Sequence, residues 1–161
     1  MVSKRRALIE KWFEGFTPYT RDSVPRYWAP ECRLELPRSP EFIPSWDQDT
    51  LRAFEAQWED IAKGATFDVH DYIEDDQNNK AAILYTCTFT FYPELEISDY
   101  KGTYVMIFHF NETQDAIVRF MEVADYANTP NILRKIEEGR KKKGLAPLSD
   151  PSAEVKAQTF Q

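Results

Sequence analysis

One acidic side chain stands inside an apolar stretch near the end of the chain's last expected strand. Glu122 lies in the run Phe-Met-Glu-Val-Ala at residues 120–124. Burial in such surroundings disfavours the charged form of a carboxyl group, so its pKa rises and it can transfer protons near neutral pH. Glu122 is therefore the first candidate for a general acid or base. The alternatives are a carboxylate paired with Arg119 or Arg33, and one at a solvated edge of the strand.

The preceding strand has two faces, and its pairing with the last strand decides which face Glu122 shares. Tyr100, Tyr104 and Phe108 alternate onto one face, and His109 lies on the other. An even hairpin loop would place Glu122 with His109, whereas an odd loop or a bulge would place it with the tyrosines, because a one-residue slip exchanges faces. We favour the tyrosine face, which carries the larger side chains. The alternatives are tyrosines that only pack, and a His109 that is a hydrogen-bonded core residue.

Five further side chains are candidates for substrate binding. Phe108 and Phe120 share strands with the tyrosines and Glu122, while Trp28 and Phe54 belong either to the core or to a pocket wall. Asp71 occupies a slot in an otherwise apolar strand register, although a β-bulge would turn it out to solvent.

The sequence lacks the residues that several other kinds of chemistry require. His70 stands among aspartates, but adjacent strand residues face opposite ways and no second histidine has ligand spacing, so we expect no metal site. The chain has no G-x-S-x-G, P-loop, G-x-G-x-x-G or H-E-x-x-H motif, and its five glycines leave little material for a phosphate cradle. We therefore expect acid/base chemistry without a cofactor.

Length and composition favour one globular domain. The 161 residues carry a formal charge of −7, and 42% are hydrophobic, which is enough for a core without disulfide or metal support. Cys32 and Cys87 are expected to be reduced core residues of a cytoplasmic protein. No apolar run is long enough to span a bilayer, so we expect no membrane partner. Only residues 127–144 are basic, so a nucleic-acid partner is also not expected.

The hydrophobic pattern predicts helices first and strands later. Helices are expected behind Ser3 as far as Gly15, over residues 24–28, and from a capping box at residues 45–48 as far as Gly64, the last being the longest. The expected strands cover residues 32–36, 66–74, 81–91, 99–110 and 116–125. A final helix covers residues 129–143, and residues 145–161 form a loosely ordered tail after a single domain at residues 1–144. This order predicts an α+β domain with a curved antiparallel sheet.

Both faces of the strand at residues 99–110 are apolar. If helices cover one face of the sheet, the other apolar face must also be buried. A homodimer in which the two sheets pack face to face is the simplest way to bury it.

Three segments together resemble the nuclear transport factor 2-like superfamily, and in particular its SnoaL-like branch. They are residues 27–36, the helix that begins near Asp47, and the strand Ala-Ile-Val-Arg-Phe-Met-Glu-Val-Ala-Asp at residues 116–125. The resemblance implies a cone-shaped sheet wrapped around a long helix, with a pocket at one end. It also implies that Glu122 is the acid or base, that Tyr100 and Tyr104 converge with it as in fungal semipinacolases, and that Arg38 at the pocket mouth holds a carbonyl or an oxyanion. A surface arginine is the alternative for Arg38.

The leading hypothesis is thus a cofactor-independent isomerase or cyclase that acts on a small hydrophobic secondary metabolite, such as an alkaloid, polyketide or meroterpenoid. A non-catalytic binding or dimeric assembly module of the same fold is one alternative. An epoxide hydrolase or dehydratase is another, and it would need an ordered water beside Glu122.

Overall fold

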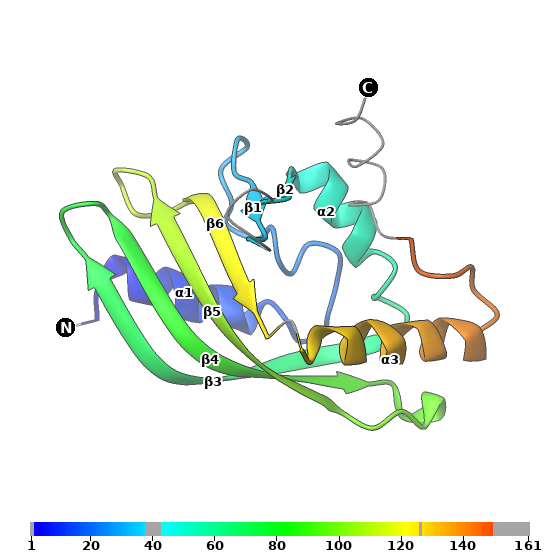
Figure 1. Cartoon of the computed structure of the whole chain (residues 1–161). Helices are drawn as coiled ribbons and strands as arrows, with labels where there is room; N and C mark the ends of the chain where they lie inside the picture. Colours follow the sequence, from blue (N-terminus) through cyan, green and yellow to red (C-terminus); the bar gives the residue numbers. More distant parts are fainter. Residues whose placement is uncertain (1, 38–42, 126, 150–161) are drawn as a thin grey trace.

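The computed structural model describes residues 2–37, 43–125 and 127–149 and shows the expected α+β architecture (Figure 1). The elements, in chain order, are α1 (Lys4–Glu14), β1 (Leu34–Glu35), β2 (Ser45–Trp46), α2 (Gln48–Glu55), β3 (Ala62–Asp75), β4 (Lys80–Phe91), a 3-10 turn (Pro93–Leu95), β5 (Tyr100–Phe110), β6 (Ile117–Ala124) and α3 (Thr129–Lys142). The four long strands and the last helix lie within a few residues of their predicted bounds.

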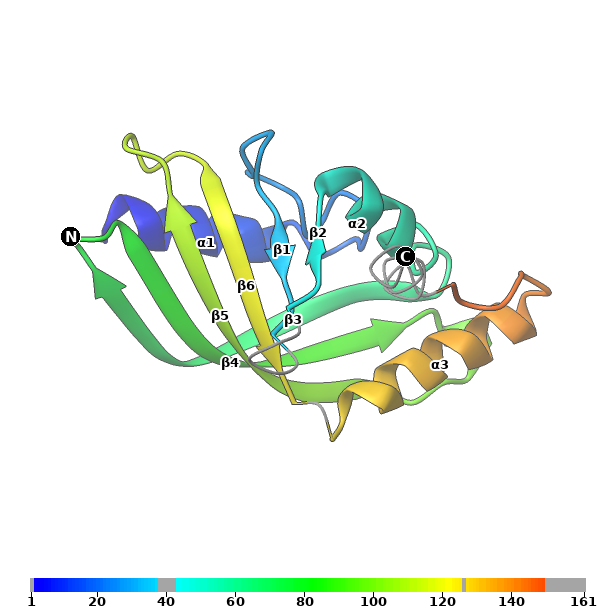
Figure 2. The same ribbon diagram turned by 45° about the horizontal axis from the view of Figure 1, so that its top comes forward.

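The six strands form one curved sheet in the order β2-β1-β6-β5-β4-β3 (Figure 2). Strands β3 to β6 pair antiparallel with their neighbours, as predicted. The short strand β1 pairs parallel with β6 and antiparallel with β2, so the sheet is mixed at that edge. Strand β2 was not predicted, because a strand of two residues leaves no periodic signal.

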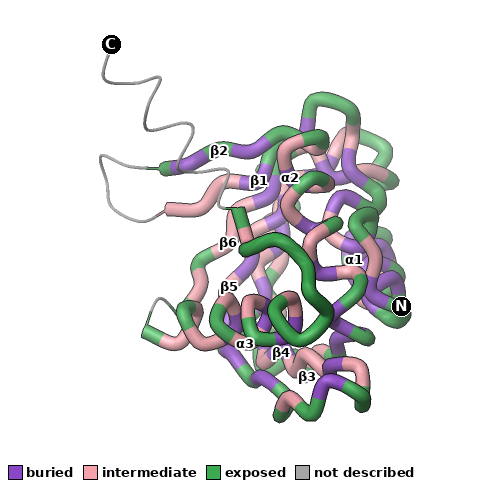
Figure 3. Tube along the Cα trace, turned by 90° about the vertical axis from the view of Figure 1, so that its right-hand side faces the viewer, coloured by how far each residue is buried: buried purple, intermediate pink, exposed green. Residues whose placement is uncertain are grey.

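One face of the sheet is the inner face of the cone. Along β5, every second residue from Tyr100 to Phe110 is buried, and Figure 3 shows the alternation along the strands. Helix α1 lies across this face (Figure 1). Its Trp12 is fully buried and packs edge-on against Phe108, with ring centroids 5.6 Å apart. Ser3 caps the helix by accepting a hydrogen bond from the Arg6 amide, as the sequence predicts.

Two helix predictions need correction. Residues 24–27 form consecutive turns and Trp28 forms an isolated β-bridge with Ile117, because their backbone is used elsewhere: Val24 O accepts from the Trp12 indole, and Tyr27 O accepts from the Ile117 amide. Helix α2 is eight residues long and α3 is the longest helix, because the chain after Glu55 continues as tight turns. These turns preserve the apolar spacing of the predicted long helix, and Gly64 lies in β3.

The segment after α3 folds back on the domain as far as residue 149. The amide of Leu148 donates to Glu137 Oε2 at 2.7 Å, and the amide of Ser149 donates to Gln57 Oε1 at 2.8 Å. The first residues of the predicted tail are therefore held in place, and residues 150–161 lie outside the described residues.

The outer face of the sheet carries exposed apolar side chains. Leu84 and Val123 are exposed and flank Val105 across β4, β5 and β6, and Ile73 lies nearby on β3. The homodimer through this face stays a prediction. Within the described ranges, no helix is long and apolar enough to cross a membrane.

The buried side chain of Arg5 links α1 to the β3–β4 hairpin, and we expect its removal to destabilise the folded protein. The Arg5 side chain is 5% exposed and binds Glu74 at 2.8 Å, with further contacts to Asp76 and Asn79. We expect Arg5→Ala to lower the free energy of unfolding by about 3 kcal/mol, because the buried arginine side chain and its contacts to the partly buried Glu74 and Asn79 are lost. Urea unfolding checks this value.

The control is Arg6→Ala, since Arg6 pairs with Glu10 at 3.0 Å but both side chains are half exposed. We expect a loss of roughly 0.5 kcal/mol or less, because exposed pairs contribute little. Equal losses in the two variants would contradict a special role for the buried pair.

Candidate active-site pocket

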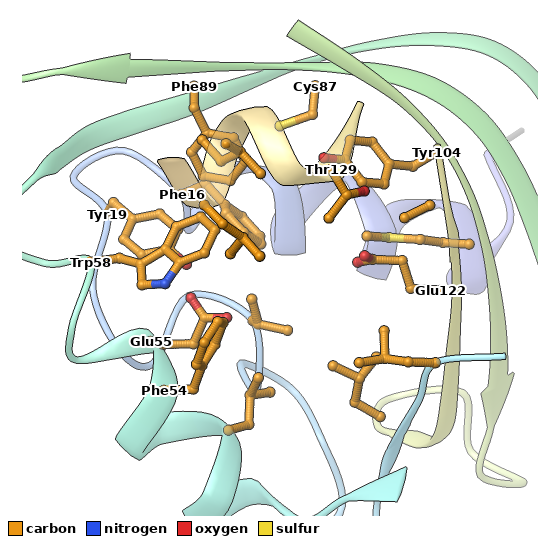
Figure 4. Close-up of a pocket in the computed structure, with 18 of the residues that line it drawn as sticks. Phe16, Tyr19, Phe54, Glu55, Trp58, Cys87, Phe89, Tyr104, Glu122 and Thr129 are labelled. Atoms are coloured by element: carbon orange, nitrogen blue, oxygen red, sulfur yellow. The ribbon is translucent and has the colours of Figure 1, made fainter. Parts of the chain in front are cut away.

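A cavity of about 220 Å³ lies between the inner face of the sheet, α2, the loop after α1, and α3 (Figure 4). Its walls are mainly aromatic and include Phe16, Tyr19, Phe54, Trp58 and Phe89. The rings of Trp58 pack against Phe54, Phe89 and Tyr19 at centroid distances of 5.6, 5.7 and 6.2 Å. These packed rings form a largely apolar hollow large enough for a small organic molecule.

A β-bulge places Glu122 on the face that lines this cavity. The β5–β6 hairpin has an even loop, with Phe110 opposite Ile117, but Val118 has no partner and His109 lies opposite Arg119. This extra residue shifts the register by one, so Glu122 lies opposite Met106 instead of Val105. The prediction that Glu122 shares a face with the tyrosines is confirmed, and the bulge is the device that achieves it.

The carboxyl of Glu122 faces the cavity, and the residue is partly buried. Figure 4 shows it projecting into the pocket from β6. Burial raises its pKa from 4.5 to about 7. A carboxyl group with this pKa is present in both its acid and its base form near neutral pH, so it can donate or accept a proton there.

Two phenols form a hydrogen-bonded pair on β5 beside Glu122. The hydroxyl oxygens of Tyr100 and Tyr104 are 3.1 Å apart, and both side chains are buried. Tyr104 lines the cavity, whereas Tyr100 lies behind it as its hydrogen-bond partner. Burial and the neighbouring Glu122 carboxyl raise the pKa of Tyr104, so its phenol stays protonated and can donate a hydrogen bond to a ligand.

The structure adds one carboxyl that the sequence analysis missed. Glu55 extends from α2 on the opposite side of the pocket from Glu122 (Figure 4) and is only 6% exposed. Burial, and secondarily the charge of Glu122, raise its pKa well above the usual value. The signal was present in the sequence: Glu55 lies four residues after Leu51 and three before Trp58, at a core position of an apolar helical face.

The predicted substrate-binding residues divide between the pocket and the core. Phe54 lines the cavity. Phe108, Phe120 and Trp28 pack behind it around Trp12, with Phe120 within 5.5 Å of Trp12, 5.4 Å of Trp28 and 5.0 Å of Phe108 between centroids. These three residues support the pocket and do not contact its space.

Two predicted residues lie away from the cavity. His109 is on the outer face with Val105 and Ile107, because the bulge that brings Glu122 inward leaves His109 outside. Asp71 is exposed, because a second register shift between Val69 and Asp71 turns it outward. The structure therefore does not bring either residue to Glu122, and Arg38 lies outside the described residues.

Among the described residues, no three His, Cys, Asp or Glu side chains are grouped so that they could hold a metal ion. The free thiols of Cys32 and Cys87 are buried. The titratable side chains that line the cavity are the carboxyls of Glu55 and Glu122, the phenols of Tyr19, Tyr85 and Tyr104, and the thiol of Cys87.

The chain matches the SnoaL-like domain family over residues 9–120. It is also similar to the monooxygenase nsrQ of Aspergillus novofumigatus, at 24% identity over 133 residues that cover 82% of this chain and 85% of nsrQ.

Solved structures of similar shape include PrhC from Penicillium brasilianum and the BvnE pinacolase from Penicillium brevicompactum. PrhC has a TM-score of 0.69 and 16% identity and covers 88% of this chain and 93% of its own. BvnE has a TM-score of 0.67 and 17% identity and covers 84% of this chain and 94% of its own. At these identities the likeness establishes a common fold.

The raised pKa of Glu122 makes the stability of the protein depend on pH. Between about pH 4.5 and 7 the folded state keeps a proton that the unfolded state has lost, so the stability linked to Glu122 falls as the pH rises through this range. Glu122→Gln removes the effect. The free energy of unfolding of the variant, relative to the original protein, should increase by about 3 kcal/mol from pH 4.5 to 7.

Urea unfolding at a series of pH values measures this difference, and Glu112→Gln in the exposed β5–β6 turn is the control. A Glu122→Gln difference that does not change with pH would contradict the raised pKa.

Proposed function

Because the chain belongs to the SnoaL-like domain family, we propose that it is an isomerase or cyclase that rearranges a hydrophobic secondary-metabolite intermediate without a cofactor. Glu122 transfers the proton in this reaction. Tyr104, supported by Tyr100, donates a hydrogen bond to an oxygen of the substrate.

The observation that carries the proposal is the Glu122 carboxyl in a largely apolar cavity, where burial raises its pKa to about 7. Proton transfer by a positioned side chain is most efficient when its pKa is near the working pH. The neutral phenol of Tyr104 lies on the same face, because Tyr104 is two residues along β5 from Met106, the residue opposite Glu122. An acid or base and a hydrogen-bond donor thus meet the ligand from adjacent strands.

This pair suits a rearrangement in which one oxygen leaves carbon and another becomes a carbonyl. An epoxide oxygen that leaves one carbon takes up a proton and stays on the other carbon as a hydroxyl. A carbon substituent migrates with its bonding electrons to the carbon that the oxygen leaves, and the neighbouring hydroxyl loses its proton and becomes the carbonyl. Glu122 supplies or removes one of these protons, and Tyr104 stabilises charge on the other oxygen. The aromatic walls hold the reactive conformation, which lowers the entropy cost of reaching the transition state.

Arg38 is retained as the group that would stabilise negative charge at the pocket mouth. This role stays a prediction that rests on the family resemblance. Homodimerisation likewise stays part of the proposal, through the exposed apolar residues on the outer face of the sheet.

The names of the similar proteins suggest two outcomes for the pocket. BvnE is a pinacolase, and pinacol-type chemistry is a rearrangement of the kind proposed above. The name of nsrQ describes a monooxygenase, so oxygen insertion is a competing reaction for a pocket of this shape. The open cavity favours a ligand-binding pocket over a module whose cone is filled by its own side chains.

The proposed roles predict a loss of turnover in two conservative variants. With a substrate identified from co-purifying metabolites or from the products of neighbouring biosynthetic genes, Glu122→Gln should lower kcat by about 10²-fold to 10⁴-fold, because general acid/base catalysis is lost. Tyr104→Phe should lower it less, by roughly tenfold to a hundredfold, because one charge-stabilising hydrogen bond is lost.

The control is again Glu112→Gln, which should keep full turnover because its side chain is exposed in a turn far from the cavity. Full turnover in both Glu122→Gln and Tyr104→Phe would refute the assignment.

Isotope labelling distinguishes the candidate reactions. An isomerase should give a product that carries no oxygen-18 from labelled water or from labelled O₂, as mass spectrometry would show. Label from water would indicate an epoxide hydrolase or a hydratase, and label from O₂ would indicate a monooxygenase. Either incorporation would contradict the isomerase proposal.

A further inference from the structure

Three residues that line the α2 side of the cavity each have a buried polar atom with no hydrogen-bond partner among the described residues. These atoms are Glu55 Oε2, Trp58 Nε1 and Trp46 Nε1. Their residues are 6%, 7% and 5% exposed. The great majority of buried polar groups in proteins are paired, so three unpaired ones around one cavity call for a physical reason.

Sequence and local structure bring these atoms to the same side of the pocket. Trp46 belongs to β2, directly before the Asp47 cap of α2, while Glu55 ends that helix and Trp58 follows one turn later. Phe54 lies between the two indoles, with ring centroids 5.2 Å from Trp46 and 5.6 Å from Trp58. Figure 4 shows the Glu55 carboxyl and the Trp58 indole nitrogen both turned toward the cavity.

These three side chains together offer hydrogen-bond donors. An indole nitrogen can only donate a hydrogen bond, so Trp46 and Trp58 require an acceptor. Burial raises the pKa of Glu55 well above its usual value, which favours the protonated carboxyl, and a protonated carboxyl is a donor as well. None of the described residues that line the cavity is a lysine, arginine or histidine, so a ligand carboxylate would find no countercharge.

We propose that Glu55, Trp58 and Trp46 form a carbonyl-binding subsite, which holds a ketone or quinone oxygen of the ligand at the end remote from Glu122. A carbonyl oxygen has two lone pairs and accepts from two donors at once. A ligand with such an oxygen satisfies buried donors that otherwise stay unpaired, whereas a ligand with a hydrocarbon group there leaves them unpaired. The pocket thus selects an oxygenated polycyclic skeleton with polar groups at two opposite ends.

This inference rests on the proposed function in one respect only, that the cavity binds an organic ligand. It assigns no proton transfer to Glu55. The subsite determines which skeleton binds and how it is oriented, and Glu122 with Tyr104 acts on the opposite end.

The test compares 9-fluorenone with fluorene, two rigid tricyclic molecules that differ in one carbonyl oxygen. Titration calorimetry of each with the full chain should show binding of fluorenone about tenfold tighter than that of fluorene, since one good hydrogen bond to an otherwise unpaired donor changes affinity by about this factor. Infrared spectroscopy of bound fluorenone should show its carbonyl stretch shifted to lower frequency than in hydrocarbon solvent.

Trp58→Phe and Glu55→Leu should each reduce the preference for fluorenone and move the carbonyl stretch back toward its value in hydrocarbon. Trp28→Phe is the matched control: the Trp28 indole nitrogen is also buried and unpaired but lies outside the cavity, so the preference should persist. Near-ultraviolet circular dichroism checks that each variant is folded. If Trp58→Phe does not fold, Glu55→Leu alone provides the test.

Equal affinity for the two probes, or an unshifted carbonyl stretch, would overturn the proposal. A shift lost in Tyr104→Phe but kept in Trp58→Phe and Glu55→Leu would also overturn it, because the carbonyl would then bind on the Glu122 side. Tighter binding of 9-aminofluorene than of fluorenone would indicate a cation site and contradict a carbonyl site. Turnover of Glu122→Gln is measured separately. The binding experiments can therefore support the carbonyl-binding subsite even if the proposed function is refuted, and the turnover measurement can support the proposed function even if the subsite is refuted.

Discussion

The burial of two carboxyl groups in a largely apolar cavity is the constraint on which the rest of the structure depends. Desolvation is the cause that raises the pKa of Glu122 to about 7, and it is also the largest cause for Glu55. No cationic side chain is found among the described residues that line the cavity, so neither carboxyl gains a neutralising partner there. Packed aromatic rings make the hollow largely apolar, and the same rings supply the surface that an apolar ligand would contact.

Small irregularities of the sheet produce this arrangement. One unpaired residue on β6, Val118, turns Glu122 inward and leaves His109 outside, and one register shift on β3 turns Asp71 out to solvent. The two sides of the pocket therefore come from different parts of the fold. Strands β5 and β6 supply Tyr104 and Glu122, while β2, α2 and the turns after α2 supply the unpaired polar atoms opposite them.

Much of this fold could be predicted from the sequence, because long strands and capped helices carry strong periodic signals. The α+β order, the four long strands, α1 with its Ser3 cap and α3 follow from such signals. The length of α2 could not be predicted, since turns and a helix place apolar residues at the same spacing. The position of Trp28 was equally hidden, because a tryptophan behind a pocket wall and one that forms the wall share the same sequence context.

The chemistry of the candidate site could be predicted from the sequence, but not all of the residues that form the site could. Glu122 stood out because a charged residue interrupts an apolar strand, and Tyr104 followed from alternation once the register was chosen. Glu55 gave the same signal on a helix, yet a helix near its end tolerates a charge at the boundary of its apolar face, so the residue was missed. Both bulges depend on tertiary pairing, which local sequence does not encode.

The titration of the Glu122 side-chain carboxyl by carbon-13 NMR, assigned by comparison with Glu122→Gln, tests this account most directly. The account predicts a midpoint near pH 7 in the protein without ligand. A midpoint near 4.5, the usual value for a solvated glutamate, would contradict it, because the carboxyl would then be in contact with water and fully ionised at neutral pH.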